Sequence, residues 1–382
     1  VVCDTQHLAK LSKEYTGVLT ELEQQVHTIS GHAFNLNSPK QLAEVLFDEL
    51  KFPVVKKTKT SRSTDAYVLE VLAKDYDIAA FLLKYRTFQK LVSTYVNKLP
   101  ELVHPITQKI HTSLNQTITA TGRLSSNNPN LQNIPVRSVE GNNIRRAFLS
   151  RFKDGRIVSM DYSQIELRVL AHLSQDSAMM AMFKQGQDIH TATASKLFNV
   201  EYNSVTKPQR EQAKTVNFGI TYGQSAFALA NQLSISRTEA KALIDAYYTQ
   251  FSSIKQFMDK VVNKVARDGF VTTMMGRVRY IDDIDSSNKG VQQAAERMAI
   301  NTCVQGSAAD IIKKAMCDVL PVIQQLQSCM VLQVHDELVF DVHPTELDIV
   351  INKIKPIMES CMVLDVPLLV DVESGVNWGD LS

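Results

Sequence analysis

The sequence predicts an α+β fold in which long helices are combined with a small number of strands. Apolar residues recur at helical spacing in residues 8–26 and 78–95, and helical patterns dominate residues 174–320. Two short apolar runs within residues 330–342 are separated by three polar residues, His335-Asp336-Glu337, and this pattern predicts a β-hairpin with those residues at its tip.

The first 102 residues are predicted to form a helical subdomain with a basic tip. Ser38-Pro39 supplies an N-cap followed by a first-turn proline, so another helix is expected to begin there. Residues 56–64 hold four cations, among them Lys57 and Lys59, with several hydroxyl groups and no acidic residue. Such a segment can bind phosphates without recognising a base sequence, but it is equally consistent with a solvated loop.

Residues 103–160 differ in character, because they are polar, rich in Asn and interrupted by Pro. We expect loops and short strands there. Arg123 is a cation set among small residues, and a surface arginine or a binding residue would explain it equally well. Residues 157–161 form a short apolar run that ends in Asp161, and a helical pattern follows at once. Asp161 is therefore expected at a strand-to-helix junction, where its carboxylate can face a cleft.

The C-terminal part is predicted to contain one long helix, the hairpin, a helix over about residues 344–362 and a last strand over 366–372. The long helical pattern covers residues 291–320, and we expect Gly306 to break it. Three polar residues recur along it at four-residue spacing: Arg297, Asn301 and Gln305. Buried donors need hydrogen-bond partners, and no acidic residue lies on that stripe.

The most informative segment is R-E-Q-A-K-T-V-N-F-G-I-T-Y-G, which runs from Arg210 to Gly223 and follows a helix-start signal at Pro208. Four residues recur every four positions: Arg210, Lys214, Phe218 and Tyr222. The two cations repel each other, and no acidic residue is interleaved, so the stripe suits an external anion. Gly219 and Gly223 each cost about 1 kcal/mol inside a helix, which close approach or hinging must offset. A triphosphate with its sugar and base fits this pattern, and so does a solvated basic helix.

Composition narrows the classes of protein to consider. The 382 residues carry a net charge of +1, so a nucleic-acid-binding surface must come from where the charges lie. The five cysteines have no C-x-x-C spacing, which argues against a disulfide framework or a zinc site and favours a reducing compartment. No apolar run of about 18 residues could span a bilayer, and no signal peptide opens the chain. The chain begins with Val1, so we expect a fragment of a longer protein.

Two carboxylates, Asp161 and Asp336, are predicted at strand ends in one α+β unit. Two-metal phosphoryl transfer uses shared carboxylates that hold ions about 3.5–4 Å apart. A site with these aspartates, the nearby Glu337 and no His/Cys cluster suits Mg²⁺ better than Zn²⁺. Taken singly, each aspartate is better explained as a turn or cap residue, and only their combination with the cationic helix points to catalysis. The absence of G-x-x-x-x-G-K-[ST] and G-x-G-x-x-G argues against a P-loop or Rossmann site.

Three segments resemble motifs A, B and C of the family-A DNA polymerases, and the resemblance is strongest to bacterial members. They are Asp161-Tyr-Ser-Gln-Ile-Glu-Leu-Arg168, the segment from Arg210 to Gly223, and Val334-His-Asp-Glu-Leu-Val339. The segments Thr121–Ser126 and Gln305–Asp310 match further parts of the family pattern. Three long motifs in the family's order make the resemblance specific, and it covers essentially the whole chain.

The resemblance implies a right-hand architecture with a helical thumb, helical fingers and an antiparallel-sheet palm. The thumb would comprise residues 1–102 and would be truncated at its start. The palm would combine residues 103–173 with 301–382, and the fingers would comprise residues 174–300.

The resemblance also implies the roles of residues in the catalytic centre. Asp161 and Asp336 would hold two Mg²⁺ ions, for which Mn²⁺ could substitute, together with the backbone carbonyl of Tyr162. Glu337 would be an auxiliary carboxylate. Lys214 would be the general acid for the pyrophosphate leaving group.

Nucleotide binding and DNA binding are assigned in the same way. The nucleotide-binding residues would be Arg210, Lys214, Phe218, Tyr222, Glu166, Gln164 and His335. Among them, Phe218 would pack on the sugar, Tyr222 would occupy the template-base stacking position, and Glu166 would be the steric gate that rejects a ribose 2′-OH. The DNA-binding residues would be Arg123, Arg297, Asn301, Gln305, Lys57 and Lys59. Donors in the minor groove can test base-pair geometry without sequence preference.

These assignments imply a DNA-directed DNA polymerase that adds dNTPs to a primer 3′-OH and releases pyrophosphate. Its partners would be primer–template DNA and dNTPs, and we expect a monomer in the bacterial cytoplasm, away from membranes, that acts in replication or repair. The chain has no room for exonuclease domains, so no proofreading is expected within these residues.

Two alternatives to this reading remain. A non-catalytic relative that only binds nucleic acid would be expected to have broken motifs, whereas Asp161, Asp336, Arg210 and Lys214 are all present. An RNA polymerase of the family is disfavoured by Glu166, and a lesion-tolerant repair polymerase stays open.

Overall fold

The computed structural model describes residues 1–58 and 61–381, which divide into two compact units. Unit 1 comprises Val1–Thr112, Asn133–Arg151 and Gly375–Ser382, and unit 2 comprises Ser113–Gln132 and Phe152–Ser374. The N-terminal helices thus group with two later segments of the chain. Each unit is described by itself.

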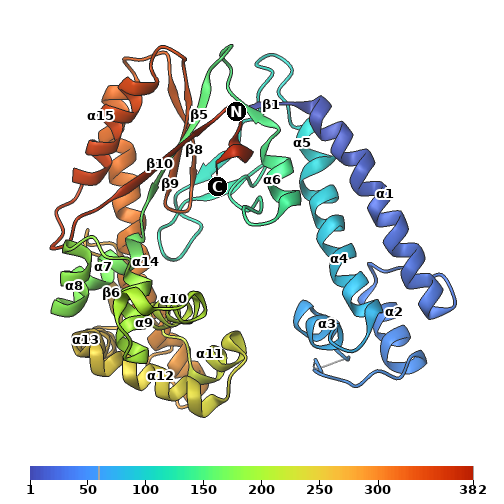
Figure 1. Cartoon of the computed structure of the whole chain (residues 1–382), viewed down its shortest axis with the longest axis horizontal. Coiled ribbons are helices and arrows are strands. Elements are labelled where there is room, and N and C mark those ends of the chain that lie inside the picture. Colours follow the sequence, from blue (N-terminus) through green and yellow to red (C-terminus); the bar gives the residue numbers. More distant parts are fainter. Residues whose placement is uncertain (59–60, 382) are drawn as a thin grey trace. The chain divides into compact units, whose positions relative to one another are not determined.

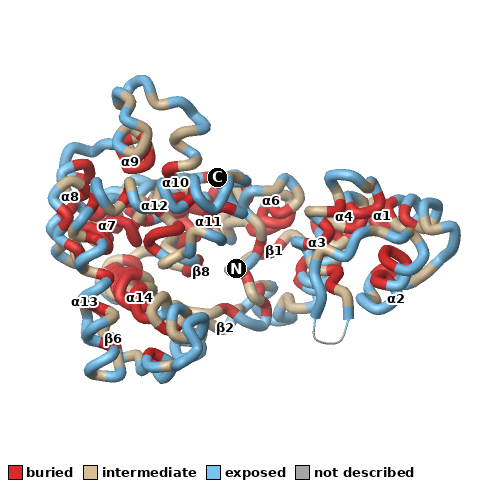
Figure 2. Tube along the Cα trace, turned by 90° about the horizontal axis from the view of Figure 1, so that it is seen from below, coloured by how far each residue is buried: buried red, intermediate tan, exposed pale blue. Residues whose placement is uncertain are grey.

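Unit 1 is mainly helical, as predicted for residues 1–102. Its elements in that region are β1 (Val2–Cys3), α1 (Thr5–Ser30), α2 (Pro39–Ala43), the π-helix η1 (Glu44–Glu49), α3 (Ala66–Leu72), α4 (Asp77–Leu91), the π-helix η2 (Val92–Val96) and α5 (Lys98–Glu101). Helices α1 and α4 run side by side, and each is buried on one flank (Figures 1 and 2). The rings of Tyr15 and Phe88 meet edge to face at 5.1 Å between these helices. Ser38 caps α2 and Pro39 begins it, which confirms the predicted start.

The later segments of unit 1 contain a helix that the sequence pattern did not predict. They form α6 (Val139–Arg145), β4 (Phe148–Leu149) and the 3₁₀ turn η4 (Trp378–Asp380). We expected only loops and strands here, because seven residues give too few positions to establish a helical period. The indole of Trp378 is buried against Phe148 and lies 4.1 Å from the guanidinium of Arg145, so the last residues are anchored in this unit.

Unit 2 is built on a four-stranded antiparallel sheet with the order β10-β5-β9-β8. The strands are β5 (Arg156–Tyr162), β8 (Cys329–Val334), β9 (Glu337–Val342) and β10 (Val370–Gly375). Helices α14 (Lys289–Ile323) and α15 (Leu347–Ser360) lie beside this sheet (Figure 1), and their apolar residues share one core with alternate residues of the strands. The predicted β-hairpin over 330–342 is confirmed, but its turn has only two residues, His335 and Asp336. Glu337, which we expected at the tip, is the first residue of β9 and pairs with Val334.

The other elements of unit 2 are mostly helices that follow β5. They are α7 (Ile165–Ser174), α8 (Ser177–Lys184), α9 (Ile189–Phe198), the 3₁₀ turn η3 (Tyr202–Ser204), α10 (Lys207–Thr221), α11 (Ala226–Leu233), α12 (Arg237–Gln250) and α13 (Ser252–Asp268). Short strands form two hairpins, β2 (Ser113–Asn115) with β3 (Ser125–Asn127) and β6 (Phe270–Thr272) with β7 (Val278–Tyr280). The β6–β7 hairpin lies in a region that we predicted to be mostly helical, and its three-residue strands are too short for a pattern.

Two boundary predictions were wrong for identifiable reasons. Helix α14 continues without a break through Gly306, because this glycine serves packing: a Cβ there would lie 2.6 Å from Cγ2 of Thr273 and 3.2 Å from the backbone oxygen of Thr121. The last strand runs over Val370–Gly375 rather than 366–372. Pro367 precedes this strand, and because proline has no N–H group it cannot donate a backbone hydrogen bond to a neighbouring strand.

Helix α10 confirms the start predicted from the sequence. Thr206 and Gln209 form a capping box, and Pro208 lies in the first turn. Gly223 lies beyond the helix end with a φ of +64°, so it terminates the helix rather than occupying its interior as we expected. A Cβ at Gly223 would lie 2.8 Å from Cγ of Arg297, which shows how closely α10 and α14 approach each other at this point.

Candidate active site

Acidic residues gather on the face of the sheet opposite α14 and α15. Along β5, Val158, Met160 and Tyr162 point into the core, so the alternation of a strand places Asp161 on the opposite face. Asp161 is paired directly with Glu337 across the β5–β9 ladder. The N–H of Tyr162 donates to the backbone oxygen of Asp336 at 3.1 Å, which brings Asp336 beside the same strand end.

This arrangement concentrates negative charge. The pKa of Asp161 is raised to about 7, first by the desolvation that the surrounding protein imposes and then by the charges of Glu337 and Asp336, although its side chain reaches solvent. Asp371 and Glu373 on β10 add smaller effects of the same sign. Burial also raises the pKa of Asp336, against the opposing charges of Arg123 and His335. Like charges placed opposite each other in a sheet are unfavourable, so the site is suited to receive a cation.

The turn that carries Asp336 is held by the side-chain amides of two glutamines. His335 has a φ of +52°, a left-handed conformation that costs energy for a residue other than glycine. The Nε2 group of Gln333 donates to the backbone oxygen of His335 at 2.5 Å. Gln132 in turn donates to the backbone oxygen of Gln333 at 3.0 Å. This chain of hydrogen bonds holds the hairpin tip and therefore the position of Asp336.

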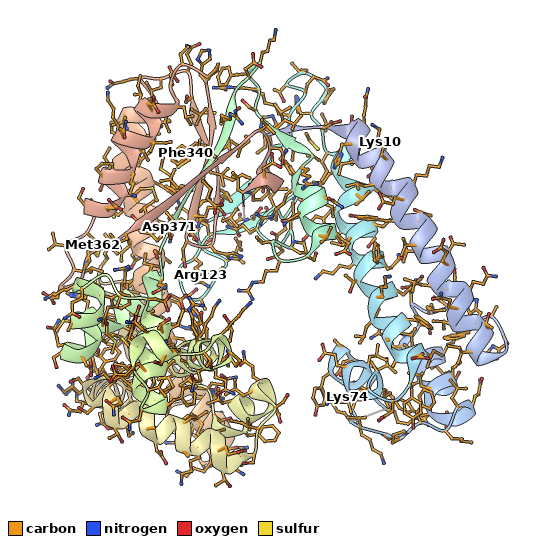
Figure 3. All side chains as sticks on the ribbon, in the orientation of Figure 1. Lys10, Lys74, Arg123, Phe340, Met362 and Asp371 are labelled. Carbon is orange, nitrogen blue, oxygen red and sulfur yellow. The ribbon has the colours of Figure 1, made fainter. Side chains whose placement is uncertain are left out.

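Arg123 connects two of the acidic residues. Its guanidinium donates to Oε1 of Glu166 at 2.5 Å and lies 4.0 Å from Oδ1 of Asp336. Glu166 is 5% exposed, and burial raises its pKa, while Arg123 and the phenol of Tyr222 act in the opposite direction. Arg123 lies at the end of the sheet nearest α10 (Figure 3). The neighbouring Gln164 precedes α7 with a φ of +54°.

Helix α10 presents its predicted stripe beside this site, with one difference. Arg210 donates through Nε and Nη2 to Asp188, at 3.1 and 2.8 Å, so one of the two cations has an acidic partner from outside the stripe. Asp188 is distant in sequence, and it also caps α9. Within residues 1–58 and 61–381, Lys214 makes no ion pair. The rings of Phe218 and Tyr222 are nearly parallel, with centroids 6.3 Å apart.

Two residues that the sequence analysis did not select, Asp188 and His190, pack against α10. The ring of His190 is buried, lies 5.6 Å from that of Phe218 and accepts through Nδ1 a hydrogen bond from Asn217 at 3.0 Å. Burial lowers its pKa to about 4, and Arg210 and Lys214 act in the same direction. Asp188 is a typical N-cap residue, so the start of α9 could have been predicted from the sequence. The packing of α9 on α10 could not, because no pattern of neighbouring residues indicates it.

Protonation of His190 supplies a test of this packing. The unfolded chain binds a proton near the ordinary value of 6.5, whereas the folded chain binds it only near pH 4. The free energy of unfolding is therefore expected to fall as the pH is lowered through this window. In His190→Gln the fall should be smaller, as measured by urea unfolding at several pH values. Equal slopes in the two proteins would contradict a buried neutral histidine.

Beside the aromatic rings lies a pocket of about 540 Å³ between α10, α11 and α14. It is lined by Phe218, Gly219, Tyr222, Ala228, Gln293 and Arg297, among others. Arg297, Asn301 and Gln305 are half-buried along one face of α14, as their spacing predicted. Within the described residues, the buried Oδ1 atom of Asn301 has no hydrogen-bond partner. An outside ligand would satisfy it.

The predicted DNA contacts are divided between the two units. Arg123 and the three polar residues of α14 belong to unit 2, whereas Lys57 belongs to unit 1. Lys57 pairs with Arg62 in an isolated antiparallel bridge at the base of the basic segment. Lys59 lies outside the described residues.

Protein ligands for a metal are few. Within residues 1–58 and 61–381, no group of three or more His, Cys, Asp or Glu side chains is placed to hold an ion. The groups at these strand ends include the carboxylates of Asp161, Asp336 and Glu337 and the backbone oxygen of Tyr162. In the same residues, none of the helices has the length and apolar character needed to cross a membrane.

The geometry and the motifs agree with the comparisons to known proteins. The model of the family "DNA polymerase family A" matches residues 5–380. The chain belongs to this family, and the family predicted from its motifs is confirmed.

Its relatives include bacterial DNA polymerase I. DNA polymerase I of Geobacillus stearothermophilus is 48% identical over 382 residues, and the match covers 100% of this chain and 44% of the relative. The thermostable DNA polymerase I of Thermus aquaticus is 46% identical over 377 residues, covering 98% of this chain and 45% of the relative. The chain therefore spans less than half the length of these curated relatives.

One solved structure shows the same mixed fold of helices and antiparallel sheet. It is described as the POL domain of Pol1 from M. smegmatis in complex with DNA primer-template and dNTP. The TM-score is 0.95 at 41% sequence identity, and the match covers 100% of this chain and 68% of the other. The predicted fold class is thereby confirmed.

Proposed function

We propose that this chain is the DNA-directed DNA polymerase region of a bacterial DNA polymerase I. It would add dNTPs to a primer 3′-OH under the direction of a template and release pyrophosphate, in replication or repair in the cytoplasm. The observation that carries this proposal is the pairing of Asp161 with Glu337 across the β5–β9 ladder, next to Asp336 in the hairpin turn, with the cationic stripe of α10 in the same unit. Residues 1–102, 174–300, and 103–173 with 301–382 would act as thumb, fingers and palm.

Family-A polymerases generally use divalent metal ions, and the residues present fit such ions. The pKa of Asp161 is raised first by desolvation and then by the charges of its acidic neighbours, and a bound cation would offset both effects. Mg²⁺ needs only one or two protein carboxylates when a substrate supplies phosphates, which agrees with the small ligand set. Asp161, Asp336 and the backbone carbonyl of Tyr162 would hold two Mg²⁺ ions, and Mn²⁺ is expected to substitute. When bound, the ions would lower the pKa of the primer hydroxyl and neutralise phosphate charge.

The residues of α10 would bind and orient the incoming dNTP. Lys214 and Arg210 would contact the triphosphate, and Lys214 would donate a proton to the leaving pyrophosphate. Asp188 orients Arg210 through two hydrogen bonds before the nucleotide arrives. Phe218 would pack on the sugar, while Tyr222 would occupy the template-base position beside the pocket of α11 and α14. Gln164 and His335 would complete the nucleotide site, and Glu337 would act as an auxiliary carboxylate.

The polar face of α14 would recognise the geometry of the base pairs in the DNA duplex. Every Watson–Crick pair presents an N3 or O2 acceptor in the minor groove, so donors there can test pairing without preferring a sequence. The residues proposed for this role are Arg297, Asn301 and Gln305, together with Arg123. Lys57 and Lys59 of the basic segment would contact phosphates, which position the duplex without reading bases.

Glu166→Ala is expected to weaken discrimination against ribonucleotides by roughly 10- to 100-fold, because the buried carboxylate would occupy the space that a 2′-OH requires. Its contact with Arg123 fixes the carboxylate in that place. The measurement is the ratio of kcat/KM values for a dNTP and the matching rNTP. Glu201→Ala, which removes an exposed carboxylate from the same unit, should leave the ratio unchanged. An unaltered ratio in Glu166→Ala would count against the gate.

Primer extension tests the proposed function directly. A labelled primer annealed to a longer template is incubated with Mg²⁺ and dNTPs, beside a reaction with rNTPs. We expect template-directed extension with dNTPs alone, and its loss when EDTA removes the metal. Binding of the primer–template without extension in Mg²⁺ or Mn²⁺ would instead indicate a non-catalytic nucleic-acid-binding protein.

A further inference from the structure

The turn that carries Arg123 rests on another arginine, Arg277. Gly122 has a φ of +82°, and a Cβ there would lie 2.5 Å from Nε of Arg277. The backbone of Gly122 is therefore in direct contact with that side chain. Thr119 closes the turn, since its hydroxyl donates to the backbone oxygen of Arg123 at 2.6 Å and its own backbone oxygen accepts from Gly122 at 3.2 Å.

Arg277 is itself held in one orientation by a buried carboxylate. Its Nε and Nη2 groups donate to the same oxygen of Asp310, at 3.0 and 2.9 Å. The other oxygen of Asp310 accepts from the hydroxyl of Thr273 at 2.6 Å. Asp310 is 5% exposed, so its charge depends on these partners. An arginine bound in this way loses most of its rotational freedom.

The hairpin that carries Arg277 makes further contacts with α14. The N–H of Met274 donates to the hydroxyl of Ser307 at 3.0 Å. Gly306 lets the helix approach both Thr273 of the hairpin and Thr121 of the turn, since a Cβ would lie within 3.2 Å of each. Strand β6 lies beside α14 in the views of Figures 1 and 2. Helix, hairpin and turn thus form one packed block.

We infer that Arg277, fixed by Asp310, is a positioning residue that sets the place of Arg123 and, through it, of the Glu166 carboxylate. The path is short: Asp310 orients Arg277, Arg277 supports Gly122, and the next residue is Arg123. Nothing in the sequence spacing links these residues, because the hairpin, the turn and α14 meet only in the fold. The inference rests on the proposed function, since it assigns Arg277 an effect on nucleotide addition and selectivity.

Without the support of Arg277, the turn would lose a neighbour on one side, and the guanidinium of Arg123 would no longer be restricted to its present contact with Glu166. A displacement of about 1 Å in a positioning group can lower the rate about 10²-fold. Arg277→Ala is therefore expected to lower kcat roughly 10- to 100-fold, while the Kd for primer–template changes less than about twofold. Its discrimination against rNTPs should fall as well, because Glu166 loses its fixed partner.

A matched control lies two residues away. Arg279 is in the same hairpin, but its guanidinium donates to the hydroxyl of Thr302 at 2.9 Å. Arg279→Ala removes the same chemical group and should leave kcat and selectivity near wild type. Arg277→Lys keeps a cation for Asp310 and an aliphatic chain under Gly122, so it should restore most of the activity lost in Arg277→Ala. Equal losses in the two alanine variants would show that Arg277 has only a general structural role.

Proteolysis supplies a readout that needs no activity. Trypsin cleaves after Arg123 only when the turn opens, and cleavage at this bond can be followed by mass spectrometry of the native chain. We expect cleavage to be about tenfold faster in Arg277→Ala and in Asp310→Asn, and unchanged in Arg279→Ala. Equal cleavage rates in all variants would overturn the inference whatever the extension assay shows.

A double-mutant cycle separates positioning from an independent effect. If Arg277 acts through Arg123, Arg277→Ala should cost little further activity in an Arg123→Ala background, where the positioned group is already absent. Additive losses would overturn the inference. Its failure is distinguishable from failure of the proposed function. If the wild-type chain does not extend primers, the proposed function is wrong, while the proteolysis comparison still tests whether Arg277 supports the turn.

Discussion

Asp336→Ala and Asp161→Ala are each expected to abolish primer extension, with a loss of at least about 10³-fold in kcat, since several kcal/mol of charge stabilisation would be removed. Both carboxylates lie at one end of the sheet beside Glu337, and desolvation together with these neighbouring charges raises the pKa of Asp161. Primer–template binding should be retained or slightly tighter, because each substitution removes a negative charge near the phosphates.

Single-turnover extension and a fluorescence binding titration, made on the same preparations, check this prediction. Asp365→Ala is a suitable control, because Asp365 is an exposed aspartate of the same unit that bonds with His172 and Gln175. It should behave as wild type in both measurements. Extension near the wild-type rate in either site variant would exclude the carboxylate from the chemistry. Loss of DNA binding would indicate that the substitution damaged the fold.

Lys214→Ala is expected to have the second-largest effect, a fall in kcat of about 10²- to 10⁴-fold, the range for loss of a general acid. Arg210 cannot replace it, because two of its nitrogen donors are engaged by Asp188. In the described residues Lys214 has no such partner, so its ammonium group is available to a triphosphate. The KM for dNTP should rise as well, since the same residue binds the ground state.

Pre-steady-state incorporation over a range of dNTP concentrations separates the two effects. Lys214→Arg should recover dNTP affinity better than rate, because arginine keeps the charge but is a poor proton donor. Lys241→Ala removes an exposed cation from α12 and should have no effect on either quantity. If Lys214→Ala changed KM alone, the residue would bind the triphosphate without acting as the acid.

Local sequence patterns were enough to predict whether most segments form helices or strands, and where some of these elements begin. Thr206, Pro208 and Gln209 define the start of α10 through cap chemistry that involves only neighbouring residues. The hairpin that carries Asp336 followed from two apolar runs and a short polar turn. Both predictions succeeded because capping and turn formation depend on interactions between residues that are close in the sequence. The two short elements that were missed, α6 and the β6–β7 hairpin, lack enough residues to show a period.

The motifs of the sequence named candidate residues, but only the tertiary structure decided which groups meet. Asp161 and Glu337 face each other because β5 pairs with β9 in one register, and a shift of one residue would separate them. Arg210 has a partner in Asp188 only because α9 packs on α10. Gly306, expected to break a helix, instead lets the turn before Arg123 approach α14. Such contacts depend on the burial of surfaces from distant segments, and no local pattern specifies them.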